Sequence, residues 1–259
     1  MANFSSTLVA AIWGVTAVTT IKAETQPPRL KSPDDTAAVE LVKSALAVRD
    51  PAKVDARIRR GSATPEQVVA FLAGLEKTDE KTAIDKGMAK FGWIGSIDHN
   101  GMSQEGVEVT FRRDGERNRR LAILTPDENG VWKMDFAAFA RRAEPSWEEL
   151  LDKEGKSGVV RVIVAKDHYY NGPFQDDKVW QSYGIAAVDR EELLLGYCKI
   201  DSPQYRALES ILANESGPTF RVTLGLRRVK DGARRQFEIT QVIAEDWVVG
   251  PKMFDEAFK

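Results

Sequence analysis

One polar and aromatic segment, residues 167–180, gathers the side chains of this sequence that are best suited to bind a ligand. It reads DHYYNGPFQDDKVW and combines an imidazole, two phenols, an amide and large aromatic rings. Binding loops use Tyr because its ring gives contact area and hydrogen bonding at a low cost in conformational entropy. We therefore predict a contact surface made of His168, Tyr169, Tyr170, Asn171, Phe174 and Trp180. The alternative interpretation is that the rings cover one end of a domain while the polar atoms face water.

The tyrosines and Phe174 of this segment need something to pack on. We expect Tyr169, Tyr170 and Phe174 to be partly exposed, or to line the junction of two domains.

Motifs of the common enzyme classes are absent from the sequence. It contains no P-loop, no G-x-G-x-x-G after a strand, no H-E-x-x-H, no C-x-x-C and no G-x-S-x-G. Two histidines and one cysteine leave few ligands for a zinc site. Cys198 lies in the apolar run LLLGYCKI, which is typical of a buried small side chain rather than a nucleophile. The sequence therefore predicts a non-enzymatic protein with no catalytic residues, no metal and no cofactor.

The main alternative is an enzyme that uses an acidic side chain or a histidine in an ionisable pocket of the first folded region. The tetrad Asp98-His99-Asn100-Gly101 sets an imidazole beside a carboxylate, and histidine can act as a general base near neutral pH. Neighbouring residues of an extended chain point to opposite sides, so Asp98 does not by itself orient His99. Asn100-Gly101 is a turn signal, and we interpret the tetrad as a surface turn. An ionisable pocket lined by Asp98, His99 or Asp135 would favour the enzyme. An apolar interior filled by aromatic rings would disfavour it, and the rings concerned are Trp93, Trp132 and Phe136.

Two basic clusters raise a third hypothesis, a nucleic-acid or polyanion binder. One contains Arg112, Arg113, Arg117, Arg119 and Arg120, and the other contains Arg221, Arg227, Arg228, Lys230, Arg234 and Arg235. Proteins that bind single strands combine positive charge with stacking aromatic rings. Phe220 and Phe237 fall in phase with core-facing positions, which leaves Arg221, Thr223, Gly225 and Arg227 facing outward. We therefore expect no specific nucleic-acid binding, and interpret the charges as a solvated hairpin.

The first residues have the pattern expected of a targeting signal. Residues 8–21 read LVAAIWGVTAVTTI, an uncharged run that is shorter than the roughly 20 residues of a membrane span. Such a run is typical of a secretory signal peptide, which predicts cleavage near Ala23 and export to the periplasm or the extracellular space. A buried element of the mature fold and an uncleaved membrane anchor are the alternatives, and contact with a membrane is expected only through this segment if it is not cleaved. Residues 24–35 then form a Pro-rich linker.

The composition is that of a folded protein of one or two domains. The chain has 259 residues, of which 42% are hydrophobic and 29% are charged, and its net charge is −2. A nearly neutral chain is not a general polyanion binder.

The region 36–142 predicts helices followed by an antiparallel sheet. Helix starts are expected at Asp34-Asp35, Asp50-Pro51 and Thr64-Pro65, the second helix ending at Gly61, with a short fourth helical segment over 79–90. Strands are expected over 107–111, 119–124 and 132–136, with turns at Asp114-Gly115 and Asn129-Gly130. This order is typical of an α+β domain. It resembles the NTF2-like or cystatin-like cone.

The region 146–259 predicts a small barrel. Ser146 caps a short helix, and strands are expected near 160–164, 182–188, 193–200, 220–226 and 237–243, with a helix starting at Ser202 after the third strand. Three strands, a helix and two strands is the order of an OB-type five-stranded barrel. An SH3-like or other small barrel is the alternative.

Three segments together resemble a group of uncharacterised exported bacterial two-domain proteins. They read VRDPAKVDARIRRG, VWKMDFAAFARRAEPSWEELL and KDHYYNGPFQDDKVWQSYGIA. In that group an NTF2-like or cystatin-like α+β domain precedes an OB-like β-barrel. The resemblance covers most of residues 36–249 and implies this architecture, but no activity.

We therefore expect an exported, two-domain, non-enzymatic protein that binds another protein or a cell-envelope component. The enzyme that uses an ionisable pocket in the cone-shaped domain and the nucleic-acid binder remain the alternatives.

Overall fold

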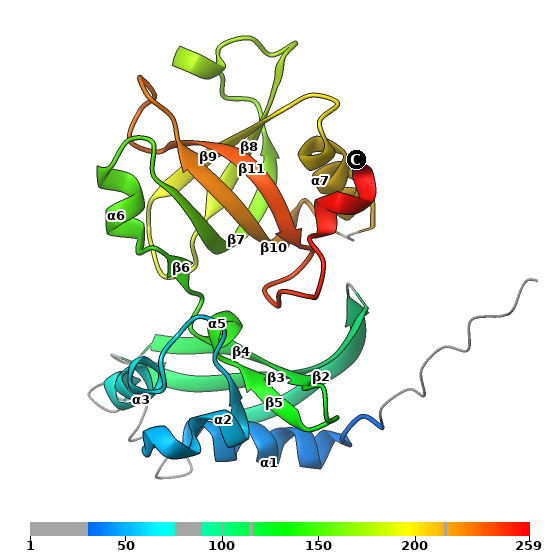
Figure 1. Ribbon diagram of the computed structural model, residues 1–259. Helices are drawn as coiled ribbons and strands as arrows, with labels where there is room; N and C mark the ends of the chain where they lie inside the picture. The colour runs from blue at the N-terminus through cyan, green and yellow to red at the C-terminus, as the bar shows by residue number, and fades with distance from the viewer. Residues whose placement is uncertain (1–30, 76–89, 100, 114–115, 215–216) are drawn as a thin grey trace, which may run out of the picture. The chain divides into compact units, whose positions relative to one another are not determined.

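The computed structural model describes residues 31–75, 90–99, 101–113, 116–214 and 217–259 (Figure 1). The predicted signal peptide, most of the linker, nearly all of the helical segment 79–90, Asn100 and the Asp114-Gly115 turn lie outside the described residues. Residues 32–259 form one compact unit of α+β type, with one sheet closed into a five-stranded barrel and a second, open sheet. None of the helices among the described residues is long and apolar enough to cross a membrane.

The open sheet has the strand order β1-β5-β4-β3-β2. Its strands are β1 (Ile58–Arg59), β2 (Lys90–His99), β3 (Met102–Arg113), β4 (Glu116–Pro126) and β5 (Trp132–Asp135). All pairs are antiparallel except β1–β5. The helices of this region are α1 (Asp35–Leu46), α2 (Val54–Arg57), α3 (Pro65–Gly74) and α5 (Phe136–Phe139), with a short 3₁₀ turn, η1 (Pro51–Lys53), before α2.

The predicted helix starts at Asp34, Asp50 and Thr64 are confirmed. The Asp34 carboxylate accepts a hydrogen bond from the Ala37 amide at 2.8 Å, and Asp50 does the same for Ala52 at 3.0 Å. Thr64 and Gln67 form a reciprocal capping box. The prediction that the second helix runs to Gly61 is wrong. Ile58 is buried in the core and takes an extended conformation, so the chain leaves the helix after Arg57 and joins the sheet.

The core of the open sheet lies between its helices and one sheet face. Val107, Val109 and Phe111 alternate into it as predicted, and Trp132 and Phe136 are buried there too. Strand β2 was not predicted. Its glycines and polar residues interrupt the alternation that reveals a half-buried strand, and most of its side chains are exposed.

The barrel closes in the order β7-β8-β9-β11-β10-β7, with β9 and β11 parallel and the other neighbours antiparallel. Its strands are β7 (Ser157–Asp167), β8 (Trp180–Ala186), β9 (Leu193–Lys199), β10 (Thr219–Arg228) and β11 (Gln236–Ala244), and the short β6 (Ala143–Glu144) pairs with β7. Helix α7 (Pro203–Asn214) connects β9 to β10, α6 (Trp147–Asp152) precedes β7, and η3 (Gly172–Phe174) and η4 (Phe254–Phe258) are 3₁₀ turns. Ser146 caps α6 as predicted, accepting from the Glu149 amide at 3.3 Å.

Strand β10 buries more of its surface than the alternating pattern predicts. Phe220 and Leu224 face the core as expected. Thr223 and Gly225 alternate with these core residues and lie on the other face as predicted, but both are buried rather than open to solvent. The Thr223 hydroxyl donates to the Asp246 carbonyl at 2.7 Å, so the chain after β11 covers this part of the strand.

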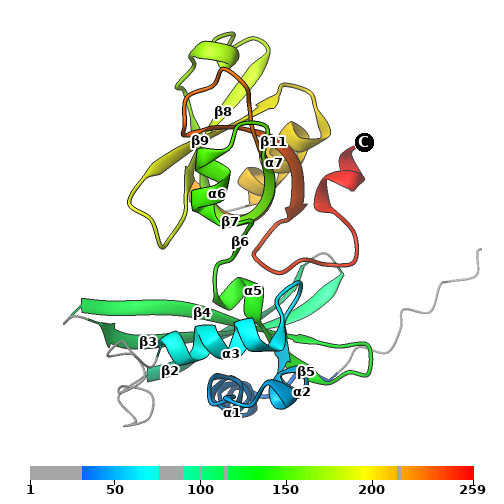
Figure 2. The ribbon, with the colours of Figure 1, turned by 60° about the vertical axis from the view of Figure 1, so that its left-hand side comes forward.

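The segment after β11 also connects the barrel to the open sheet (Figures 1 and 2). The Trp247 indole donates to the Val162 carbonyl at 3.1 Å, and the Trp247 carbonyl accepts from Arg161 at 2.9 Å. Arg59 of β1 donates to the Val249 carbonyl at 2.9 Å. Trp247 and its neighbour pack in a small apolar cluster with Ile123 of β4. The division into domains at 36–142 and 146–259 stays a prediction.

Candidate functional site

One end of the barrel carries a pocket of about 410 Å³, here named the barrel-end pocket. It lies between two connections, the one from β7 to β8 and the one from β10 to β11, with β9 at its side. The lining residues are Asp167, Tyr169, Asn171, Leu193, Leu195, Ala233, Arg235 and Gln236. The predicted contact segment 167–180 therefore supplies part of this pocket.

Phe174 anchors that segment to the barrel. Its ring stacks on Tyr197 of β9, with centroids 4.1 Å apart and planes inclined by 7°, and meets the edge of Trp180 at 4.9 Å. Only 1% of Phe174 is exposed. The expectation that Phe174 is partly exposed is therefore wrong, because the strand offers an aromatic face for it to cover. Trp180 is half-buried, and the Lys199 ammonium lies over its ring, 5.8 Å from the ring centroid.

A chain of hydrogen bonds behind the pocket joins its two connections. The side chain of the buried Gln236 donates through Nε2 to Asn171 Oδ1 and, at 3.2 Å, to the Tyr197 hydroxyl. Its side-chain oxygen Oε1 accepts from the backbone amide of Ala233 at 2.9 Å. The Tyr197 hydroxyl in turn donates to the Tyr169 carbonyl at 3.0 Å. Burial raises the pKa of Tyr197, so the phenol keeps the proton that it donates. These bonds fix the backbone of the segment on which Tyr169 and Asn171 stand.

The side chains at the mouth of the pocket are both apolar and polar. Tyr169 is 51% exposed and Leu193 is 55% exposed. Asn171 donates to the Tyr169 hydroxyl at 3.0 Å, which leaves the hydroxyl proton available to a ligand. The Asp167 carboxylate accepts from the His168 amide at 2.6 Å.

The predicted residues separate into three groups. Tyr169 and Asn171 line the pocket, whereas Phe174 and Trp180 contact each other and are not among its lining residues. The exposed His168 and the half-buried Tyr170 are not among the lining residues. The prediction missed Leu193 and Gln236. Arg235 was counted in a basic cluster. Nothing in the sequence links Arg235 and Gln236 to a segment some 60 positions earlier, or Leu193 to a segment that ends 13 positions before it.

Most of the arginines of the β10–β11 hairpin have partners. Arg221 binds Asp246 with two hydrogen bonds of 2.9 and 3.0 Å, and Arg227 pairs with Glu238. Arg234 pairs with Asp152 at 3.1 Å and Glu192 at 3.6 Å, and the buried Arg228 donates to turn carbonyls. Within the described residues, the Arg235 side chain makes no hydrogen bond or ion pair. The acidic partners therefore compensate much of the hairpin's positive charge.

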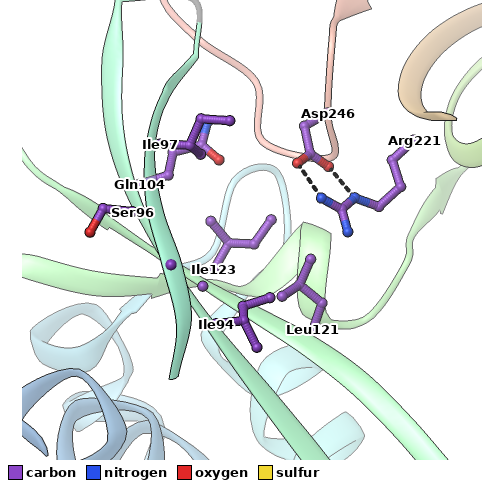
Figure 3. Close-up of a pocket in the computed structure, with 10 residues that line it drawn as sticks. Ile94, Ser96, Ile97, Gln104, Leu121, Ile123, Arg221 and Asp246 are labelled. Carbon is purple, nitrogen blue, oxygen red and sulfur yellow. Dashed lines mark hydrogen bonds and ion pairs between the residues drawn. The ribbon is translucent and has the colours of Figure 1, made fainter. Parts of the chain in front are cut away.

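A second pocket, the sheet-side pocket, lies between the open sheet and the barrel (Figure 3). Its volume is about 220 Å³, and Ile94, Ile97, Leu121 and Ile123 face the Arg221–Asp246 ion pair across it, with Gly95, Ser96, Gln104 and Gly106 completing the lining. An adjoining space of about 360 Å³ shares Ile97 and the ion pair and is also lined by His99, Thr219, Phe220 and Glu245.

The adjoining space meets part of the condition for the enzyme hypothesis, which was an ionisable pocket lined by Asp98, His99 or Asp135. His99 lines it together with charged groups, and the His99 Nδ1 atom is buried without a hydrogen-bond partner in the described part of the chain. Asp98 and Asp135 do not line it. Trp93 is 43% exposed, and its indole donates to the buried Glu105 at 2.8 Å.

The Asp135 carboxylate has partners within the fold. Its carboxylate accepts from the Ala138 amide at 2.8 Å at the start of α5, and lies 3.7 Å from Arg59. Burial raises the pKa of this carboxyl, although Arg161 and Arg59 act in the opposite direction. Asp135 therefore holds the start of α5 in the core.

The described residues include one thiol, Cys198, and side chains of metal-ligating type. Cys198 is buried as predicted, and burial raises the pKa of its thiol to about 12, which keeps it protonated at neutral pH. In that part of the chain, no three or more His, Cys, Asp or Glu side chains are grouped to hold a metal ion. Comparisons with protein-family models, with curated proteins and with solved structures found no match.

Proposed function

We propose that this chain is an exported, non-enzymatic binding protein, and that the barrel-end pocket holds its ligand, a cell-envelope component or part of a partner protein. The observation that carries the proposal is that side chains able to contact a ligand are exposed on a backbone that hydrogen bonds hold in place. Tyr169 and Leu193 present apolar surface to solvent. The Tyr197 hydroxyl, itself bonded to Gln236, holds the backbone carbonyl of Tyr169. A site that is rigid before binding loses less conformational entropy when the ligand arrives.

The finer fold assignment supports the same site. We propose that the barrel is OB-like, because its closed strand order, its single parallel pair and the helix after its third strand agree with that topology. In OB-type barrels, ligands bind beside the connections from strand one to two and from strand four to five. Those connections correspond to the two that border the barrel-end pocket. We also propose that the helices and the open sheet form the cone-shaped domain of the NTF2-like or cystatin-like type.

Export is part of the proposal and has its own test. Residues 1–23 are proposed as a signal peptide and residues 24–35 as the linker that follows it. N-terminal sequencing of the native protein should find a start near residue 24 in the periplasm or the medium. Native cytoplasmic protein that still begins with Met1 would refute this part.

Binding to the cell envelope can be tested by sedimentation. The purified protein is mixed with isolated envelope fractions, and the pelleted fraction is compared between the wild type, Tyr169→Ala and Tyr170→Ala. Tyr169→Ala should lower the pelleted fraction several-fold, because it removes the exposed ring of the pocket. Tyr170→Ala is the matched control, since Tyr170 does not line the pocket. No pelleting by the wild type, or equal losses in both variants, would contradict the proposal.

The second candidate function is an enzyme in which His99 acts as a general base. The space lined by His99, Glu245 and the Arg221–Asp246 pair is the observation that favours it. A panel of chromogenic esters and phosphates tests this candidate. Turnover by the wild type that is lost in His99→Ala, with the melting temperature unchanged, would favour the enzyme over the binding protein.

A further inference from the structure

Arg235 lines the barrel-end pocket and differs from its neighbouring arginines in having no partner among the described residues. Arg221, Arg227 and Arg234, on the same hairpin, each bind at least one carboxylate of the chain. Arg235 has no such partner within the described residues, is exposed, and lines the pocket. A guanidinium presents a planar fork of donors that matches the two oxygens of a carboxylate or of a phosphate.

We propose that the barrel-end pocket takes a saccharide that carries a carboxylate, which Arg235 binds. This inference rests on the proposed function of the same pocket. A carboxylate fits better than a phosphate because the pocket also contains the Asp167 carboxylate. A phosphate monoester near neutral pH carries between one and two negative charges, so Asp167 repels it more strongly than a singly charged carboxylate.

The remaining lining groups suit a sugar ring. The ring of Tyr169 and the side chain of Leu193 offer apolar surface to the C–H face of a sugar. The Asp167 carboxylate accepts hydrogen bonds from hydroxyl groups, and the Tyr169 hydroxyl can donate one. The ligand therefore combines a flat apolar face, several hydroxyl groups and one acid group.

An extended peptide fits this end of the barrel less well. Peptides that add to a sheet need an edge strand with unpaired main-chain groups. Strand β9 pairs with both β8 and β11, and β11 pairs with both β9 and β10. The strands beside the pocket are therefore not edge strands, and recognition must come from side chains.

Calorimetry with a matched pair of probes tests the inference. The probes are tetragalacturonate and its fully methyl-esterified form, which keeps the sugar rings but lacks the charge. The wild-type protein should bind the acid at least tenfold more tightly than the ester, and the difference should shrink as salt is added because the contact is electrostatic. Arg235→Gln should remove the preference for the acid. Tyr169→Ala should weaken binding of both probes.

Arg234→Gln is the control, because it removes the same charge from the adjacent position, where Asp152 and Glu192 already hold the guanidinium. It should keep the preference for the acid, and the melting temperatures of all variants should confirm that they fold. No binding of either probe, equal binding of acid and ester, or equal losses in Arg234→Gln and Arg235→Gln would overturn the inference. If the wild-type protein still sediments with envelope fractions in any of those cases, the proposed binding function stands. If it does not sediment, that function is refuted as well.

Discussion

The ring of Phe174 lies flat against the ring of Tyr197, with 4.1 Å between the centroids. The hydroxyl group of the same Tyr197 donates to the Tyr169 carbonyl, so one residue of β9 holds the binding segment by an apolar and a polar contact together. The exposed ring of Tyr169 thus stands on backbone that the barrel itself fixes. This relationship makes the stability of the barrel and the geometry of the barrel-end pocket depend on the same side chains.

Phe174→Ala should destabilise the protein strongly. Removing a fully buried aromatic ring costs about 3–5 kcal/mol in the free energy of unfolding, because it leaves a cavity as well as lost contacts. Urea denaturation measures the change. Val179→Ala is the control on the same connection, since that side chain is 42% exposed and its loss should cost less than about 0.5 kcal/mol. A cost below about 1 kcal/mol for Phe174→Ala would show that the stack does not hold the segment.

Gln236→Ala should loosen the segment from Asp167 to Gly172. The variant leaves the Asn171 side-chain oxygen Oδ1 and the Ala233 backbone amide without their partner, at a cost of about 1–3 kcal/mol. Hydrogen exchange should become faster at the amides of this segment than in the rest of the barrel. Gln175→Ala, at an exposed position just after η3, should leave both stability and exchange unchanged. Uniform exchange in the two variants would contradict the role assigned to Gln236.

Asp135→Asn should change how stability depends on pH. Burial raises the folded-state pKa of Asp135 above its ordinary value of 3.8, so the folded state holds the proton more tightly than the unfolded state. The stability that the protonated carboxyl contributes is fully present below about pH 3.8 and is lost as the pH rises through the folded pKa. The asparagine does not titrate. The free energy of unfolding of the wild type should therefore fall, relative to the variant, as the pH rises from about 4 to above the folded pKa.

Urea unfolding of both proteins at a series of pH values tests this sign. Arg59 and Arg161 are the cations that act on Asp135. If the wild type instead gains stability relative to the variant as the pH rises, the hydrogen bond from the Ala138 amide and the attraction of these arginines together outweigh the cost of burial.

The basic β10–β11 hairpin should not bind single-stranded nucleic acid at physiological salt. A single-stranded nucleic acid that bound these arginines would have to displace the carboxylates of Asp246, Glu238 and Asp152, with which they already form ion pairs. Fluorescence anisotropy at about 0.15 M salt should show no binding, a condition under which screening acts over roughly 8 Å. Submicromolar affinity with a log–log salt slope of about −0.7 per phosphate contact, lost on replacing Arg227 and Arg228 by Ala, would favour the nucleic-acid hypothesis.

The helix starts and most of the strands could be predicted from the sequence because their signals are local. The caps at Asp34, Thr64 and Ser146 each act on an amide three residues later. The alternation along β10 identified its core face, since side chains of a strand point to opposite sides in turn. Strand β2 escaped prediction because glycines and polar residues replace that alternation.

The candidate site could be predicted only in part. The sequence by itself determined that residues 167–180 carry binding chemistry, because Tyr and Asn side chains have that capacity wherever they stand. Closure of the barrel decided which of them reach the pocket: it buried Phe174 on Tyr197 and brought Asn171 to Gln236, 65 positions later. The same closure and the covering segment after β11 buried Thr223 and gave Arg221 an acidic partner, while Arg235 kept none within the described residues. These outcomes depend on distances between strands far apart in the chain, and a local pattern of residues contains no information about them.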